Sequence, residues 1–487
     1  MKNRVQLVTY IDRLSGGGIS DLAVLLNGPL ASLFSGVHLL PFYDPIDGAD
    51  AGFDPVDHSR VDARLGDWVD IRDLSGNVEI MADLIANHIS RQSPQVQDYL
   101  TRGRASAWDG LLLTRERVFP EGADDKMLGA IYRPRPGLPF SETTLGDGST
   151  VNLWTTFTPD QVDIDVTNPL GRAYLDGILE TFADNGVGMV RLDAVGYCIK
   201  KPGTSCFMLP ETFDYIDTLS GKVRALGMEV LVEIHAYYKK QIAIAEKVDR
   251  VYDFALPPLV LHAFALKTSK PLKHWLDVRP ANAITVLDTH DGIGIIDIGA
   301  GDNGEPGLVP DAELDALVEW IHDNSSGQSR LATGAAASNL DLYQVNCTYY
   351  DALARNDRRY LLARAIQFFT PGIPQVYYMG LLAGTNDMEL LARTGVGRDI
   401  NRHYYTPREI DAALHTTVVE KLCDLIRLRN SHPAFGGSFE LPACPDTELV
   451  MTWRHGQDTA SLHINFTNDH YSLEYTDCGR PARLHLG

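Results

Sequence analysis

Short apolar runs alternate with longer helical stretches along most of the chain. Eight of these runs have the length of β-strands, and they lie at residues 5–10, 36–41, 79–87, 188–194, 229–235, 251–255, 283–288 and 375–378. Runs such as VEIMADLIAN and MEVLVEIH are apolar at almost every position, which is typical of parallel strands covered on both faces. The repeated alternation therefore predicts an α/β fold, an eight-stranded (β/α)8 TIM barrel.

Two intervals between predicted strands are too long for a simple strand and helix unit. The first covers residues 88–165 and follows the third strand, and the second covers 292–350 and follows the seventh. Segments that follow strands belong to the carboxyl-terminal face of such a barrel, where active sites lie. We therefore expect two inserted subdomains that act as lids or specificity loops, and a barrel built from residues 1–87, 166–291 and 351–433.

The pattern changes near the end of the chain. Residues 434–487 contain the alternating runs ELVMTWRH and TASLHINF, separated by the turn-like HGQD. This pattern predicts a small antiparallel β domain with a structural role.

Composition and net charge limit the kinds of molecule that the protein is expected to bind. The chain has 43 basic and 64 acidic residues, a net charge of −21, which disfavours nucleic acid and anionic membranes. It has no apolar run near the roughly 20 residues of a membrane span. The chain has six cysteines without a CxxC pair and no visible signal peptide, so we expect a cytoplasmic enzyme. We expect it to be either a monomer or a homodimer.

Polar residues gather where the predicted strands end, which is where a barrel carries its chemistry. They are Asn87 and His88, Arg191 and Asp193, Glu233 and His235, and Asp288, Thr289, His290 and Asp291. Singly, Asp193 could cap a helix, Glu233 could pair with Lys239, and Asp291 could form an Asx turn. Three carboxylates around one cavity are electrostatically costly, however, and instead suit acid, base and nucleophile roles.

A metal or an organic cofactor is the competing explanation of these residues. The sequence contains neither an HExxH nor an EF-hand motif, and Arg191 would repel a cation from the pocket of Asp193. It also lacks a GxGxxG motif after a strand and a Walker-type loop. We expect neither a metal nor a cofactor.

The strand-end motifs together resemble the signature regions of the α-amylase family of retaining glycosidases and transglycosidases, glycoside hydrolase family 13. They are Asp83-x-x-x-Asn87-His88, Arg191-Leu192-Asp193-Ala194, Glu233, Asp288-Thr289-His290-Asp291 and the segment QVDID at 161–165. The resemblance implies that Asp193 is the nucleophile, Glu233 the general acid/base and Asp291 the transition-state stabiliser. It further implies that Arg191 keeps Asp193 ionised, and that His88 and His290 hydrogen-bond sugar hydroxyls.

Further segments resemble one branch of that family, the sucrose phosphorylases. They are GADAGFDP at 48–55, IYRPRPG at 131–137, GTSCF at 203–207, SNLDLYQ at 338–344 and GRDINR at 397–402. By this resemblance Asp50 and Arg398 bind the far edge of a glucosyl ring, and Phe53 and Phe157 form apolar walls. The implied site for fructose or phosphate comprises Tyr132, Arg135, Tyr197, His235, Asp341, Leu342, Tyr343 and Gln344.

The resemblance implies phosphorolysis of sucrose by inorganic phosphate, giving α-D-glucose 1-phosphate and D-fructose through a covalent glucosyl-enzyme. Alternatives are a phosphorylase of sucrose 6′-phosphate or glucosylglycerol, an α-glucoside hydrolase or transglucosidase, and a non-catalytic barrel scaffold. Tyr132, Arg135 and Gln344 favour plain sucrose, and the intact carboxylates disfavour a scaffold. For the acceptor residues a structural role is the other interpretation: Tyr132 and Arg135 could pack a proline-rich loop, Phe53 could belong to the core, and 341–344 could begin a helix.

Overall fold

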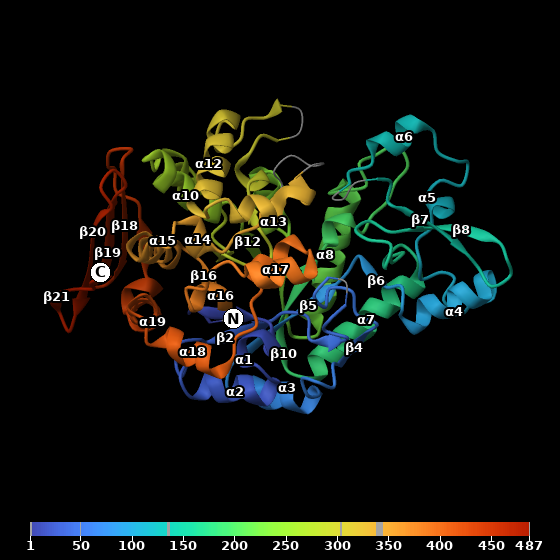
Figure 1. The fold of residues 1–487 in the computed structure, drawn as a ribbon, viewed down its shortest axis with the longest axis horizontal. Coiled ribbons are helices and arrows are strands. Elements are labelled where there is room, and N and C mark those ends of the chain that lie inside the picture. The colour runs from blue at the N-terminus through green and yellow to red at the C-terminus, as the bar shows by residue number, and fades with distance from the viewer. Residues whose placement is uncertain (1, 49, 134–136, 302–303, 338–343, 487) are drawn as a thin grey trace.

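A closed barrel of eight parallel strands forms the centre of the computed structural model, which describes residues 2–48, 50–133, 137–301, 304–337 and 344–486 (Figure 1). The strands are β1 (Gln6–Thr9), β2 (Gly36–Leu39), β5 (Glu79–Ile85), β10 (Val187–Asp193), β11 (Glu229–Val232), β12 (Arg250–Asp253), β13 (Ala283–Thr285) and β16 (Ile373–Tyr377). Each overlaps one predicted run, so the predicted barrel is confirmed.

The barrel strands are apolar because both of their faces are covered. Every residue of β1, β2 and β16 is buried. A separate apolar cluster lies within the barrel, made of Met81, Met189, Leu231, Tyr252, Phe254, Ile284, Val286 and Ile373. Outside it pack helices such as α2 (Ile19–Asn27), α7 (Pro169–Asp184), α8 (Pro210–Ala225) and α15 (Asp357–Phe369).

Local sequence signals begin these helices. At α7 the Asn168 side chain accepts the N–H of Leu170, and Pro169 takes the first turn, where a missing N–H does no harm. At α3 (Trp68–Ser75), Asp67 accepts the N–H groups of Val69 and Asp70. These side chains satisfy backbone N–H groups that the first turn of a helix leaves without a partner.

Strand register sets the height of the polar residues in the barrel. Arg191 on β10 lies level with Asp83 on β5 and Leu231 on β11. Asp193 and Glu233 therefore both lie two residues further toward the carboxyl-terminal end. Their side chains emerge at the same rim, because alternate residues of a strand share a face.

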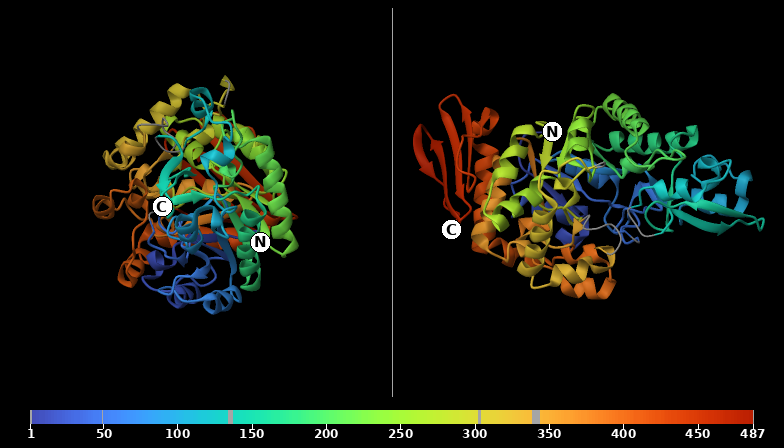
Figure 2. Two further views of the ribbon diagram at one scale, coloured as in Figure 1. Left: turned by 90° about the vertical axis from the view of Figure 1, so that its right-hand side faces the viewer. Right: turned by 90° about the horizontal axis from the view of Figure 1, so that it is seen from above.

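The long segment after β5 carries its own elements. These are β6 (His88–Ser90), α4 (Pro94–Arg102), η1 (Gly103–Ala105), α5 (Arg115–Val118), α6 (Asp125–Ala130), β7 (Phe140–Thr144), β8 (Thr150–Trp154) and β9 (Gln161–Asp163). A local core of Leu113, Val118, Phe119, Ile131 and Trp154 also includes Cys206 from the segment after β10. The long segment projects from one end of the molecule (Figure 2). Its strands β6 and β9 pair antiparallel.

The segment between β13 and β16 contains β14 (Ile293–Gly294), η3 (Ile296–Ile298), α12 (Asp311–Asn324), α13 (Gln328–Ala337), β15 (Gln344–Val345) and α14 (Tyr349–Ala352) before α15. The short strands β14 and β15 pair antiparallel, with Gly294 opposite Gln344. This pairing brings Gln344 close to the end of β13.

The carboxyl-terminal segment forms the predicted antiparallel sheet, at the end of the molecule opposite the first long segment (Figure 2). Its strands are β17 (Ser438–Glu440), β18 (Glu448–His455), β19 (Asp458–Asn465), β20 (His470–Asp477) and β21 (Arg480–Arg483). The Trp453 indole N–H donates to the Phe369 carbonyl at 2.7 Å and so joins the sheet to α15.

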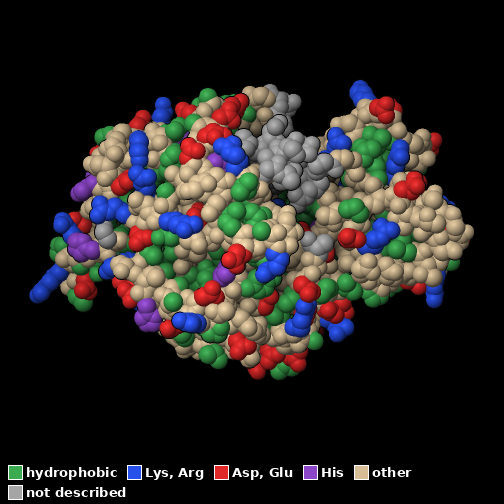
Figure 3. Space-filling model, in the orientation of Figure 1, with side chains coloured by type: hydrophobic (Ala, Val, Ile, Leu, Met, Phe, Trp, Pro, Cys, Tyr) green, Lys and Arg blue, Asp and Glu red, His purple; other side chains and the backbone are tan. Residues whose placement is uncertain are grey.

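Acidic and basic side chains are interspersed over the surface drawn in Figure 3. Among the described residues, no helix combines the length and the apolar character that crossing a membrane requires.

Candidate active site

A cavity that is open to solvent lies at the carboxyl-terminal end of the barrel. Its lining contains the predicted residues Asp50, Phe53, His88, Phe157, Asp193, Tyr197, Glu233, His235, His290, Asp291, Gln344 and Arg398. Arg191 lies beneath Asp193, and Tyr132 stacks on the lining residue Phe207. The predicted residues Arg135, Asp341, Leu342 and Tyr343 lie outside the described residues.

Asp193 ends β10 and rests on a buried charge network. Arg191 Nη1 is 2.8 Å from Asp193 Oδ1 and 2.5 Å from Asp83 Oδ1. His38 Nε2 is 2.9 Å from the other Asp83 oxygen. The Arg191 side chain is only 2% exposed, so its interaction with Asp193 is little screened by solvent.

Glu233 lies just beyond β11, on the other side of the same guanidinium. Its Oε1 is 3.7 Å from Arg191 Nη2, and its Oε2 is 3.4 Å from the Ala194 backbone nitrogen. Arg191 therefore contacts both carboxylates, and it holds Asp193 more closely than Glu233. The alternative partner Lys239 lies elsewhere, because its ammonium pairs with Glu305 at 3.1 Å.

The two carboxyl groups have different surroundings. Burial raises the pKa of Asp193 well above its usual range, and the negative charge of Glu233 adds to the effect. Arg191 opposes this shift, and it contacts Asp193 at 2.8 Å but Glu233 only at 3.7 Å. Neighbouring carboxyl groups in such unequal surroundings are suited to different chemical roles.

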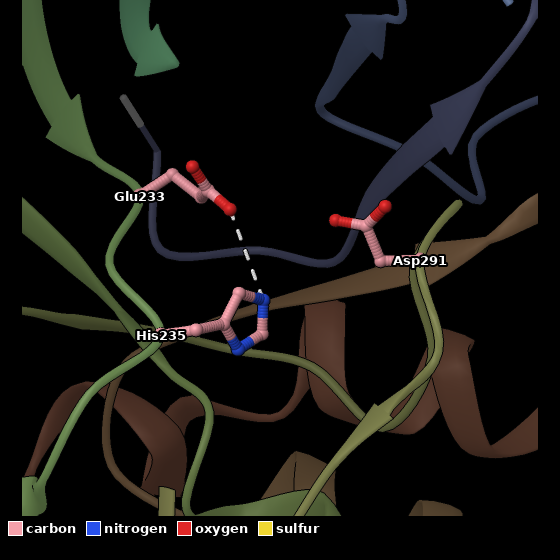
Figure 4. A group of neighbouring side chains, drawn as sticks. All are labelled: Glu233, His235 and Asp291. Carbon is pink, nitrogen blue, oxygen red and sulfur yellow. Dashed lines mark ion pairs between the residues drawn. The ribbon is translucent and has the colours of Figure 1, made fainter. Parts of the chain in front are cut away.

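Asp291 faces Glu233 and His235 from the segment after β13 (Figure 4). Burial alone would raise its pKa, but the guanidiniums of Arg398 and Arg402, 2.8 and 3.9 Å from Asp291 Oδ1, hold that pKa well below its usual range. Burial lowers the pKa of His290 to about 3, so this imidazole is neutral at neutral pH. Asp291 thus stays negatively charged beside the other two carboxyl groups.

His235 is fixed from behind. Its Nδ1 is 2.9 Å from Asp297 Oδ2, and its Nε2 is 3.2 Å from Gln344 Nε2. Burial opposes protonation, yet the charges of Asp297 and Glu233 raise the pKa of His235. Its Nε2 edge faces the cavity and lies 3.8 Å from Glu233 Oε1 (dashed in Figure 4).

Aromatic rings form the cavity wall in a continuous series. His88 contacts Phe157 with ring centroids 5.3 Å apart, and Phe157 contacts Tyr197 at 5.1 Å. Phe207 packs between Tyr197, at 4.6 Å, and Tyr132, at 4.7 Å. Phe53 stacks on His290 at 4.7 Å and so forms a separate apolar surface beside Asp291.

Comparison with known proteins places the chain in a family. A search of protein-family models found no match. The chain is 59% identical over 478 residues to a sucrose phosphorylase of Agrobacterium vitis, covering 98% of both proteins. It is 54% identical over 464 residues to that of Bifidobacterium adolescentis, covering 95% of this chain and 92% of the relative. The chain belongs to the sucrose phosphorylase family.

A solved structure of that family agrees in fold. The crystal structure of sucrose 6F-phosphate phosphorylase from Thermoanaerobacter thermosaccharolyticum superposes with a TM-score of 0.91 at 37% identity. The match covers 99% of this chain and 97% of the other. The barrel, both long segments after β5 and β13, and the final sheet thus share one architecture with that enzyme.

The described donor set suits guanidinium groups better than a metal ion. Glu233, His235 and Asp291 each offer one atom within 4.8 Å of the others. Arg398 already contacts Asp291 at 2.8 Å, and Arg191 lies 3.7 Å from Glu233. A divalent cation at this point would face both guanidiniums at close range, which is electrostatically unfavourable.

Several residues of the site were not singled out from the sequence. Phe207, Ala194, Gly196 and Ile234 line the cavity. Arg402, 1% exposed, donates from Nε to the His290 carbonyl at 2.9 Å and so holds the segment that carries Asp291. Phe207 lies in the GTSCF motif and Arg402 in the GRDINR motif. The motifs indicated that these segments belong to the site, but not which contacts the two side chains make.

Proposed function

We propose that this protein is a retaining glycosyltransferase that catalyses the reversible phosphorolysis of sucrose to α-D-glucose 1-phosphate and D-fructose. One observation carries the proposal: Asp193 and Glu233 flank a single buried guanidinium, and Asp291 lies across the same cavity. A retaining mechanism needs two carboxyl groups only about 5–5.5 Å apart. Sequence identity of 59% to a sucrose phosphorylase supports the same substrates.

In the first step Asp193 attacks the anomeric carbon of the glucosyl group. The bond to the fructosyl oxygen breaks, its electron pair stays on that oxygen, and Glu233 supplies the proton. The products are free fructose and a glucosyl ester of Asp193. Asp291 stabilises the positive charge that develops on the sugar ring, because its own charge is already fixed in place.

In the second step an oxygen of inorganic phosphate attacks the same carbon and the ester bond to Asp193 breaks. Two inversions give net retention, so the product is the α-anomer. Phosphate is already anionic at neutral pH, so Glu233 has less work as a base in this step. Its raised pKa makes His235 more readily protonated than an ordinary histidine, which favours binding of the incoming anion.

We assign the remaining lining residues to sugar and acceptor binding. Asp50 and Arg398 close the pocket behind the glucosyl ring, and Phe53 and Phe157 cover its apolar faces. His88 and His290 bind ring hydroxyls. Tyr132, Tyr197, His235 and Gln344, with Arg135, Asp341, Leu342 and Tyr343, form the site that fructose leaves and phosphate enters.

We also propose that residues 88–165 and 292–350 act as inserted subdomains that cover the cavity. Phe157 and Gln344, which line it, come from these two segments. Cover matters here because the glucosyl-enzyme waits for phosphate among far more numerous water molecules. For the location of the enzyme we propose the cytoplasm, which fits the six free cysteines of the chain.

One assay tests the proposed reaction. The protein is incubated with sucrose, with and without phosphate, and the glucosyl product is identified. We expect α-glucose 1-phosphate and fructose in equal amounts when phosphate is present. Free glucose as the main product in both mixtures would instead indicate a hydrolase, and turnover only of sucrose 6′-phosphate or glucosylglycerol would indicate a sister phosphorylase.

A further inference from the structure

A buried lysine lies directly behind the aromatic wall of the cavity. Lys200 follows η2 (Val195–Tyr197), and its side chain is only 2% exposed. Its ammonium nitrogen is 2.7 Å from Asp163 Oδ2 and 3.0 Å from Asn87 Oδ1, and it also donates to the Tyr197 carbonyl. Lys200 is not among the residues that line the cavity.

The three acceptors come from three separate parts of the chain. Asp163 ends β9 in the first long segment, and Asn87 lies between β5 and β6. Tyr197 belongs to the turn that follows the proposed nucleophile on β10. One ammonium group therefore joins the barrel rim at two strands to the segment that covers it, using all three of its donors.

Each acceptor also adjoins a ring of the wall. Asn87 precedes His88, and Tyr197 is itself a wall residue. Asp163 accepts the backbone N–H of Thr156 at 3.0 Å and its hydroxyl at 2.6 Å, and Thr156 precedes Phe157. The ammonium thus bonds directly to the Tyr197 backbone, to the side chain of the residue before His88 and, through Asp163, to the residue before Phe157.

Charge makes this link specific to a cation. The Asp163 side chain is 1% exposed, so its carboxylate has little access to water. A buried carboxylate that loses its cation is strongly destabilised, whereas a neutral side chain at both positions leaves no unpaired charge. Substituting Lys200 alone removes the link and leaves the Asp163 charge unpaired, whereas substituting both residues removes the link and the charge together.

We propose that Lys200 is a positioning residue that fixes the wall formed by His88, Phe157 and Tyr197, and thereby keeps water away from the glucosyl-enzyme. This inference rests on the proposed function, because only a phosphorylase divides a glucosyl-enzyme between phosphate and water. Lys200 acts through the rings and does not contact the sugar.

The test compares Lys200→Met with the matched control Lys201→Met. Lys201 is adjacent in sequence, but its side chain is 56% exposed and pairs with Glu211 at the surface. Glucose and glucose 1-phosphate formed from sucrose are measured together at one phosphate concentration. The kcat and the KM for phosphate are measured separately. We expect the ratio of glucose to glucose 1-phosphate to rise about tenfold in Lys200→Met, because small misplacements of a site are enough for changes of this size. In the control the ratio stays at the wild-type value.

A second variant separates positioning from stability. Lys200→Met/Asp163→Asn removes the unpaired charge, so we expect thermal stability to recover while the product ratio remains raised. A ratio of glucose to glucose 1-phosphate that is unchanged in both variants would overturn the inference. So would a ratio that returns to the wild-type value in the double variant when stability recovers, or failure of both variants to fold. The wild-type protein decides the proposed function separately, because it yields glucose 1-phosphate whatever Lys200 does.

Discussion

Among single residues, Arg191 connects the carboxylates of the site. It contacts Asp83, Asp193 and Glu233 from one buried guanidinium, with the closest contacts to the two aspartates. Its positive charge lowers the pKa of Asp193 against the effect of burial. The unequal distances to one arginine support the different roles that we propose for Asp193 and Glu233.

The proposed role of Glu233 as a proton donor predicts a substrate-dependent defect. Glu233→Gln should lower kcat/KM for sucrose by about 10²–10⁴, because the fructosyl oxygen then leaves without a proton. With α-glucosyl fluoride, whose leaving group needs no proton, the loss in the first step should be much smaller. Initial rates with the two donors measure this difference.

The matched control is Glu246→Gln, an exposed glutamate that adjoins α9 (Tyr238–Ala245). It should turn over both donors like the wild-type protein. Equal losses for the two donors in Glu233→Gln would rule out the assigned role.

At the scale of elements, the strand ends and the turns after them set the site, and close packing leaves them little freedom. Gly380 in α16 (Tyr378–Leu381) lies against the buried pair of Asp288 and Arg364. A Cβ atom there would come within 2.0 Å of the Asp288 carboxylate. The backbone after β16 can approach this ion pair only because the residue has no side chain.

Two glycine substitutions should therefore have opposite effects on stability. Gly380→Ala should lower the free energy of unfolding by ~3 kcal/mol, because it displaces a buried ion pair. Gly177→Ala, in the exposed face of α7 with open space around it, should raise that free energy by ~0.5–1 kcal/mol through helix propensity. Urea unfolding measures both, and a Gly380→Ala protein as stable as the wild type would refute the packing argument.

Some features of these elements could be predicted from the sequence and others could not. The eight strands were predictable because strands buried on both faces are apolar throughout, and Asp193, Glu233 and Asp291 were candidates because they follow such strands. The ion pair of Lys200 with Asp163 was not predictable, since the two residues are brought together only by β9 folding back onto β6. The pairing of Lys239 with Glu305 rather than Glu233 likewise depends on the path of the chain after β13.

For the whole molecule, the buried histidines link folding to pH. Burial lowers the pKa of His58 to about 4 and that of His290 to about 3, both below the unfolded value near 6.5. Burial likewise lowers the pKa of His38 and His88. At these four histidines the unfolded chain therefore binds more protons than the folded protein below about pH 6.5.

The sign of the pH effect follows from these depressed pKa values. The stability they contribute is complete above about pH 6.5 and is lost as the pH falls toward 4, by up to ~1.4 kcal/mol per pH unit for each histidine. Urea unfolding at pH 7, 6 and 5 should give falling free energies of unfolding. His58→Gln removes one of these histidines and should show a shallower fall. Stability that rises on acidification would contradict this account.

The most direct test of the central claim is to identify the residue that carries the glucosyl group. Glu233→Gln protein is mixed with α-glucosyl fluoride without phosphate, digested, and the modified peptide is sequenced by mass spectrometry. We expect one glucosyl group, esterified to Asp193, which disappears when phosphate is added and leaves as glucose 1-phosphate. A glucosyl group on another residue, or none on a protein that still turns over this donor, would contradict the proposed mechanism.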